Sequence, residues 1–299
     1  MGTMITATGI AENTLSSLEM TAQAGLACVE KAGMDLTDVD LLINVGIAHD
    51  ENTMEPAMAP LILKKMGLNP DPIRQHTNFT MCFDLYNDAC GFMHAVQTAD
   101  AYLQTGEARS VLIVSGDIHP SMARKEDFPY EPVGAAVLLT YDRQQEASGF
   151  THFGFRTSAN HDRGFMVGAN LLAAHERGEK GKDHIQIFQQ PDFPDNLYEF
   201  MLQSARGYLP QAGLDPDQIK FLVASQQINN LGHRLYDDLG FNNGTRVITV
   251  DDRYGITHTA SLPLSLHVLW EEGGPQKNDT VLLASAGAGL TSFYAVYTA

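Results

Sequence analysis

The sequence is poor in the features that mark membrane, secreted and nucleic-acid-binding proteins. No apolar run approaches the ~20 residues that a membrane-spanning helix needs. Three cysteines (Cys28, Cys82 and Cys90) are too few for a disulfide framework, which predicts free thiols and a cytoplasmic location. The first residues lack the basic-then-apolar pattern of a secretory signal. Basic residues are also scarce, and the net charge of −17 argues against nucleic acid and membranes as partners.

What the sequence does contain is an alternation of strands and helices. Apolar residues make up 44% of the chain, enough to bury a sizeable core. Strands are predicted at 4–10, 39–46, 78–85, 110–115 and 134–141, and helices at 15–31, 56–66 and 92–105. Asn13 and Thr14 are predicted to cap the first helix. Strands that alternate with helices in this way indicate an α/β fold.

The chain also repeats itself. Residues 32–43 align without gaps to residues 212–223, and the predicted strand 110–115 matches 280–285 in the same order. This repeat predicts two similar α/β halves with a site between them. We place the halves at 1–142 and 196–299. The segment 143–195, which breaks the repeat, is predicted to be a connecting insertion or lid, or simply a mobile connection without chemistry.

Cys90 is the first candidate for a reactive group. It follows the strand 78–85 in a tight turn and precedes the helix 92–105. A thiol at such a turn lies near unpaired N–H groups and the positive end of the helix dipole, which lower its pKa and favour the nucleophilic thiolate. The alternative is that Cys90 is a small buried apolar residue, as many free cysteines are. Histidines show no metal-ligand spacing, so no metal is expected.

Four stretches of the chain together resemble one family. They are residues 85–113, 226–229, 254–264 and 286–291. In these the sequence resembles the thiolase-like superfamily, in its ketoacyl-acyl-carrier-protein synthase III branch. The resemblance implies two stacked halves in a five-layered α-β-α-β-α arrangement. It also implies a thioester of acyl carrier protein or coenzyme A as the partner, no resident cofactor, and a dimer that pairs through the strand near 78–83.

The family's catalytic residues are not retained. The resemblance implies a Cys-His-Asn triad, but without gaps these positions hold Ala89, Gln226 and Ile256. Cys90 lies one residue after the nucleophile position. One residue turns a helical side chain by about 100°, which would direct the thiol away from the expected pocket. A one-residue insertion among residues 86–88 would instead bring Cys90 to the nucleophile position. The stretch after the first strand, which helps to hold coenzyme A in the family, is also missing.

Other residues offer partial replacements for the triad. His258 lies in the turn that the repeat pairs with the Cys90 turn, where it would be a base or a hydrogen-bonded loop residue. Gln226 cannot exchange a proton near neutral pH, but it can orient a carbonyl. Asn229 matches a motif residue that holds its loop. The N–H of Gly289 would complete an oxyanion hole with the N–H of residue 89 or 90.

Two functions follow from these residues. In the first, Cys90 accepts an acyl group and passes it to an alcohol, amine or carbon acceptor in specialised, fatty acid or polyketide metabolism, with His258 as the base. In the second, the chain is a non-catalytic partner of an active ketoacyl synthase III-like paralogue, in a heterodimer rather than a homodimer. The absence of the family's His and Asn makes decarboxylative condensation the least favoured version of the first function.

Overall fold

The computed structural model describes residues 2–12, 14–69, 79–142, 148–158, 164–178, 180–242 and 244–299. The proposed cap at Asn13 and parts of the predicted strand 78–85 and of the segment 143–195 lie outside these residues. No helix of the described residues is long and apolar enough to cross a membrane.

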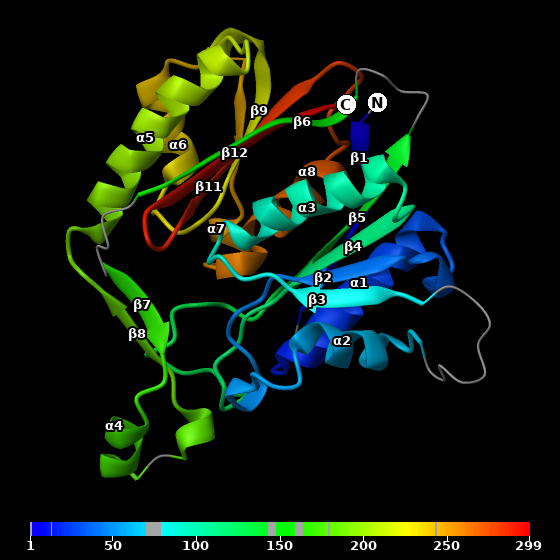
Figure 1. Ribbon diagram of the computed structural model, residues 1–299. Helices are drawn as coiled ribbons and strands as arrows, with labels where there is room; N and C mark the ends of the chain where they lie inside the picture. The colour runs from blue at the N-terminus through cyan, green and yellow to red at the C-terminus, as the bar shows by residue number, and fades with distance from the viewer. Residues whose placement is uncertain are drawn as a thin grey trace.

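One ten-stranded sheet contains two equivalent sets of five strands (Figure 1). The first half has, in spatial order, β1 (Gly2–Ala11), β5 (Gly134–Asp142), β4 (Ser110–Ser115), β2 (Leu41–Asn44) and β3 (Met81–Asp84). The second half has β6 (Gly149–Thr157), β12 (Thr291–Thr298), β11 (Thr280–Gly287), β9 (Ile219–Ala224) and β10 (Arg246–Ile248) in the corresponding order. The halves join where Thr3 of β1 pairs with Phe150 of β6. The strands therefore follow the internal repeat of the sequence.

Helices form three layers around the two halves (Figure 1). Helices α1 (Ser17–Ala32) and α2 (Met58–Met66) pack on the outer face of the first half, and α5 (Phe193–Gln211) and α6 (Leu231–Leu239) on that of the second. Helices α3 (Gly91–Thr105) and α8 (Ser261–Glu271) lie between the halves and share one apolar core with both. The five-layered thiolase-like arrangement is thus confirmed.

The first helix begins later than its predicted cap. Ser16 is the N-cap of α1, and its hydroxyl accepts a hydrogen bond from the Glu19 N–H. Ser16 and the backbone of Ser17 also donate to the carboxylate of Asp50, which fixes the start of the helix against a distant loop. At the other end, Gly33 adopts a φ of 64°, a left-handed conformation that ends the helix one residue beyond the predicted range 15–31.

The connecting segment has a different extent from the predicted one. Residues 149–157 form β6, which pairs with β12 along its length and so belongs to the second half. The excursion from the sheet contains β7 (Phe165–Gly168), α4 (Leu171–Glu176) and β8 (Gln186–Gln189), and β7 pairs with β8 as a separate two-stranded sheet. The segment rejoins the second half at α5.

Candidate functional site

Two turns from the two halves meet at the centre of the molecule. The first connects β3 to α3, and the second precedes α8. Asp88 stands three residues before the start of α3 and has a φ of 48°, while His258 stands three residues before α8 and has a φ of 51°. Such positive φ angles are uncommon outside glycine and direct the side chain out of the turn. Here they bring the side chains of two equivalent positions into contact.

His258 lies between two carboxylates. Its Nε2 is 2.6 Å from Asp88 Oδ1, and its Nδ1 is 2.9 Å from Asp117 Oδ2. The exposed fraction of the residue is 3% for His258, 7% for Asp88 and 1% for Asp117, so the cluster is almost completely removed from water. Buried charges of this kind persist only when each is paired and hydrogen-bonded.

The rest of the Asp117 carboxylate is held by backbone groups. Asp117 follows β4, and its Oδ1 accepts the N–H groups of Ile47 and Ala48, each at 2.7 Å. Its Oδ2 also accepts from the backbone and hydroxyl of Thr259. Asp117 therefore ties the loop after β2 to the turn that carries His258, and it sets the orientation of the imidazole ring.

The two carboxylates keep His258 positively charged. Burial alone would lower the pKa of His258, but Asp117 and Asp88 outweigh it and raise this pKa to about 10. Burial acts the other way on Asp117, and there the charge and hydrogen bond of His258 hold the pKa of the carboxyl well below its usual range. Near neutral pH His258 is thus an imidazolium, which cannot accept a proton as a general base does.

Tyr130 covers one face of the imidazolium. The two rings are stacked, with centroids 4.2 Å apart and planes 4° apart. Burial, together with the charges of Asp88 and Asp117, raises the pKa of the Tyr130 hydroxyl above its ordinary value, so this residue stays neutral. An aromatic ring face is a favourable neighbour for a cation, and the stack further stabilises the charged form of His258.

Cys90 lies in the apolar core and not beside His258. Its exposed fraction is 0%, and its Sγ faces the Thr291 carbonyl at 3.9 Å. Burial, and to a lesser degree the charge of Asp88, raise the pKa of the thiol although Ser285 lowers it. The expected lowering of the thiol pKa at this turn is therefore wrong, because the side chain points into the core. The repeat pairs Cys90 with Ala260, which is also 0% exposed.

Gln226 lies at the edge of the site with its amide fully engaged. Its Nε2 donates to Asp251 at 2.5 Å and to the Gly255 carbonyl at 2.9 Å. Its Oε1 accepts the N–H of Thr257 at 2.8 Å and the hydroxyl of the same residue at 3.1 Å. An amide has two N–H donors and one oxygen with two lone pairs, so Gln226 has no free group to orient a carbonyl. It holds the turn before α8 in place.

The remaining predicted residues are dispersed around the site. Ala89 is buried, and its carbonyl accepts from Ser285 at 2.9 Å. Ile256 and the exposed Asn229 line a pocket beside His258. Gly289 is exposed with a φ of 73°. The N–H of the preceding residue, Ala288, donates to Asp88 Oδ2 at 2.7 Å.

Sequence reasoning missed Asp88, Asp117 and Tyr130. Asp88 adjoins the predicted residues, but a one-residue difference in the turn decides which side chain leaves the core. Asp117 had a usable signal, because polar residues directly after buried parallel strands gather at one edge of a sheet. Tyr130 lies in an irregular segment where no periodicity predicts its position.

The pocket beside His258 has a volume of about 320 Å³. Tyr130, Ile256 and His258 line it, and the β7–β8 excursion adds Phe165 and Ile187 to the lining. Within the described part of the chain, no group of three or more His, Cys, Asp or Glu residues is placed to hold a metal. The pocket combines apolar side chains with amides and charged groups, a lining suited to an organic ligand that has both polar and apolar parts.

Comparison with known proteins agrees with this architecture. Residues 83–159 match the family 3-oxoacyl-[acyl-carrier-protein (ACP)] synthase III, and residues 209–298 match its C-terminal domain, together more than half of the chain. The chain is 26% identical over 294 residues to the beta-ketoacyl-[acyl-carrier-protein] synthase III of Brucella anthropi, covering 94% of this chain and 84% of that one. The Sulfurovum protein of the same name is 24% identical over 282 residues, with coverage of 91% and 78%.

Solved structures share the fold. The 3-oxoacyl-(acyl carrier protein) synthase III, FabH, of Pseudomonas aeruginosa has a TM-score of 0.79 at 19% identity, with 100% of this chain and 98% of that chain covered. A variant of Xanthomonas campestris OleA with bound lauric acid and lauroyl-CoA has a TM-score of 0.79 at 15% identity and 99% coverage of both chains. At these identities the likeness extends to the fold alone.

Proposed function

The chain belongs to the 3-oxoacyl-[acyl-carrier-protein] synthase III family, and from this premise we propose that it is a non-catalytic member that pairs with an active relative. The observation that carries the proposal is the buried Asp88–His258–Asp117 cluster. It fills the junction of the two turns with fixed charges, where acyl transfer would need a nucleophile and a neutral base.

Three side chains support a non-catalytic role, because none of them can take part in acyl transfer in its present position. The thiol of Cys90 is buried with a raised pKa, so the thiolate that would attack a thioester is disfavoured. The imidazole of His258 is already protonated. The amide of Gln226 is saturated by protein groups. Acylation of Cys90 would require its thiol to leave the core.

The loop around Gly289, which would bind an oxyanion, already donates a hydrogen bond within the protein. The Ala288 N–H donates to the carboxylate of Asp88 at 2.7 Å. An oxyanion that formed beside this carboxylate would meet a like charge in a site from which water is excluded. At such short range in a low-dielectric site this repulsion is large. Asp88 therefore opposes the step that the family's site promotes.

One edge strand of the sheet, as far as the described residues show it, supports pairing with a second subunit. Strand β3 ends the ten-stranded sheet, and Phe79, Met81 and Tyr86 in and around it are each about half exposed. An edge strand with exposed apolar side chains is prone to pair with another chain. The proposed partner is a relative that has the family's Cys-His-Asn residues. Pairing with it would explain why this chain keeps the fold and the pocket without the catalytic residues. The three free cysteines suit a reducing, cytoplasmic location.

The acyltransferase is the second candidate, and the pocket of about 320 Å³ that His258 helps to line is the observation that favours it. This function takes an acyl group from acyl carrier protein or coenzyme A and needs Cys90 to turn out of the core. His258 must also lose its proton, and Gly289 must replace Ala288 as the N–H donor. None of these groups has the required arrangement, so the geometry supports this candidate less well.

Intact-mass measurement separates the two candidates. The purified chain is incubated with acetyl-CoA, lauroyl-CoA and an acyl carrier protein charged with the same acyl groups. We expect no mass increase, because neither Cys90 nor His258 is available. A stoichiometric adduct on the wild-type chain that disappears in Cys90→Ser would overturn the proposal. In a second experiment, the chain is co-expressed with a relative that retains the triad. We expect a stable heterodimer in which only the relative is acylated.

A further inference from the structure

The β7–β8 excursion, residues 164–178 and 180–190, is attached to the two halves in different ways (Figure 1). Its two strands pair with each other and, among the described residues, not with the ten-stranded sheet. A two-stranded sheet is only marginally stable by itself, so contacts at its two ends fix its position. One end lies against α5 of the second half, and the other lies against the loop after β2 of the first half.

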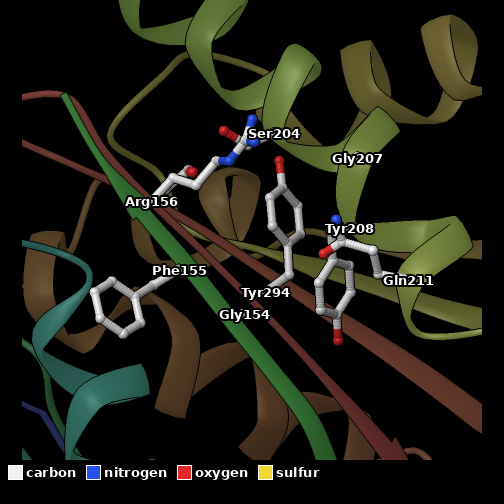
Figure 2. A pocket seen from close by; sticks show the side chains of 9 residues that line it. Gly154, Phe155, Arg156, Ser204, Gly207, Tyr208, Gln211 and Tyr294 are labelled. Atoms are coloured by element: carbon white, nitrogen blue, oxygen red, sulfur yellow. The ribbon is translucent and has the colours of Figure 1, made fainter.

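The end at α5 is apolar and firmly held. Phe165 of β7 stacks on Phe193 at the start of α5, with ring centroids 5.6 Å apart, and packs against the core of the second half. Helix α5 is held in turn by Tyr208, whose ring stacks on that of Tyr294 of β12 with centroids 5.3 Å apart (Figure 2). Because such aromatic contacts bury much apolar area, this end of the excursion stays with the second half.

The other end is held by Asn52 of the first half. Its Nδ2 donates to the backbone carbonyls of Lys182 at 3.0 Å and of His184 at 2.8 Å. Asn52 has a φ of 53°, in the left-handed region where asparagine is enriched. Glu51 also pairs with Lys182, but both side chains are about half exposed, and such surface pairs contribute little to stability. The two hydrogen bonds of Asn52 therefore tie the excursion to the first half.

The same contact contains a polar cavity of about 220 Å³. Seven of its eight lining residues are polar or charged. The first half supplies His119, Ser121, Lys125 and Asp127, and the excursion supplies Lys180, Asp183, His184 and Ile185. Burial of apolar surface is the main force that holds the parts of a protein together. Little of it is lost when this contact opens, so the excursion can separate here and remain attached at α5.

The excursion also forms part of the pocket beside His258. Ile187 and Gln189 of β8 contribute to its lining, together with Phe165 near the attachment to α5. Other lining residues, among them Tyr130, belong to the two halves themselves. A movement that carries β8 away from the first half would therefore widen this pocket, while the residues around His258 keep their places.

We propose that the β7–β8 excursion is a lid on the pocket beside His258, hinged at α5 and latched to the first half by Asn52. In the latched form the lid restricts the entry of organic ligands. Loss of the two Asn52 hydrogen bonds releases the polar end, and β8 moves away from the pocket. The inference concerns access to the pocket and not its chemistry, so it goes beyond the proposed function and holds for either candidate.

Thiol labelling inside the pocket tests the proposal. Ile256→Cys places a thiol in the lining, and peptide mapping by mass spectrometry separates its reaction with a bulky maleimide from that of the native cysteines. Asn52→Asp keeps the side-chain size but turns a carboxylate towards the two carbonyls. We expect it to speed labelling at residue 256 by roughly tenfold or more, because two hydrogen bonds are lost. Asn52→Gly, which suits a positive φ, should act in the same direction without adding a charge.

Spin labels measure the movement of the lid directly. They are attached at Met166→Cys in β7 and Lys64→Cys in α2, two exposed positions, in a Cys82→Ser background that removes the partly exposed native thiol. Pulsed EPR should give one main distance when Asn52 is present and an added longer population in Asn52→Asp. An unchanged distance distribution would overturn the latch. A longer distance without faster labelling at residue 256 would overturn the lid, since the excursion would move without covering the pocket.

Asn242→Asp is the matched control. Asn242 also donates its amide to a backbone carbonyl, that of Asp217 at 2.9 Å, but it lies outside the excursion and does not line the pocket beside His258. We expect it to change neither the labelling rate nor the distance distribution. Equal acceleration by Asn242→Asp and Asn52→Asp would overturn the proposal, because the labelling rate would then report a general loosening of the fold.

Discussion

The turn before α3 and the turn before α8 occupy equivalent places in the two halves but differ in chemistry. Each puts a residue with positive φ three positions before its helix, and these residues are Asp88 in the first half and His258 in the second. One position before each helix stands a fully buried small residue, Cys90 and Ala260. The comparison teaches that the geometry of the turn, and not the nature of the nearest reactive side chain, decides which residue enters the site. It assigns Cys90 to the core.

Moving the thiol to the position that faces His258 is the strongest test of this comparison. Asp88→Cys places a sulfur beside the imidazolium and the Ala288 N–H, both of which favour a thiolate. We expect intact mass to change from no acyl adduct in the wild type to a substantial one after incubation with acetyl-CoA. Ala89→Cys is the control, because that side chain is only 1% exposed. Acylation of Ala89→Cys but not of Asp88→Cys would show that the gapless register is correct and that the two turns are not equivalent.

Removing the carboxylate that serves both His258 and the loop after β2 should have the largest effect on stability. Asp117→Ala leaves two backbone N–H groups unpaired and His258 with one acid partner. Breaking a buried ion pair costs about 3–5 kcal/mol, and we expect a loss in this range from urea unfolding. Asp117→Asn, which keeps the shape and one acceptor oxygen, should lose less. A loss below about 1 kcal/mol for Asp117→Ala would mean that the cluster contributes little to the fold.

The charged state of His258 predicts how stability depends on pH. A pKa raised from 6.5 to about 10 contributes stability that is fully present below about pH 6.5 and is lost as the pH rises towards 10. Asp117 behaves oppositely, and its contribution is lost only in acid, below its ordinary pKa of 3.8. We expect the unfolding free energy to fall between pH 7 and pH 10, and to fall less in His258→Gln. NMR of labelled histidine gives an independent reading, and a His258 signal that titrates near pH 6.5 would contradict the charged cluster.

Cys90 should give the smallest effect. If it fills the core as Ala260 does in the other half, Cys90→Ala removes one buried sulfur and costs about 1 kcal/mol, without changing the pocket beside His258. In the native protein, thiol-specific reagents should modify the partly exposed Cys82 before Cys90. Rapid modification of Cys90 under native conditions would contradict its burial.

Much of the fold could be predicted because it depends on patterns that repeat. The fully buried strand β4 has its predicted bounds, and the aligned segments fold as equivalent strands β2 and β9. The sequence does not predict strand β6, because only its first two residues are fully buried and its outer end is exposed, so it lacks a clear alternation of buried apolar and exposed polar residues. Its partner β12 lies more than 130 residues away in sequence, so the pairing leaves no local signal.

The candidate site was harder to predict than the fold. His258 and the turn before α3 are visible in the sequence, but the pairing of His258 with Asp88 depends on two φ angles that no residue type enforces. Cys90 attracted attention through its chemistry, whereas its position one residue before the helix directs it inward. Sequence patterns predict which segments meet. They do not predict, to within one residue, which side chains face each other.

The apolar layer between the halves has a consequence for how the protein unfolds. Leu41 and Phe92 of the first half share one core with Leu266 and Val281 of the second. Neither half retains a complete core when the other is removed, so the two should unfold as one cooperative unit in spite of their origin as a repeat. A cut in the β7–β8 excursion, outside this core, should leave two fragments that remain associated and melt together.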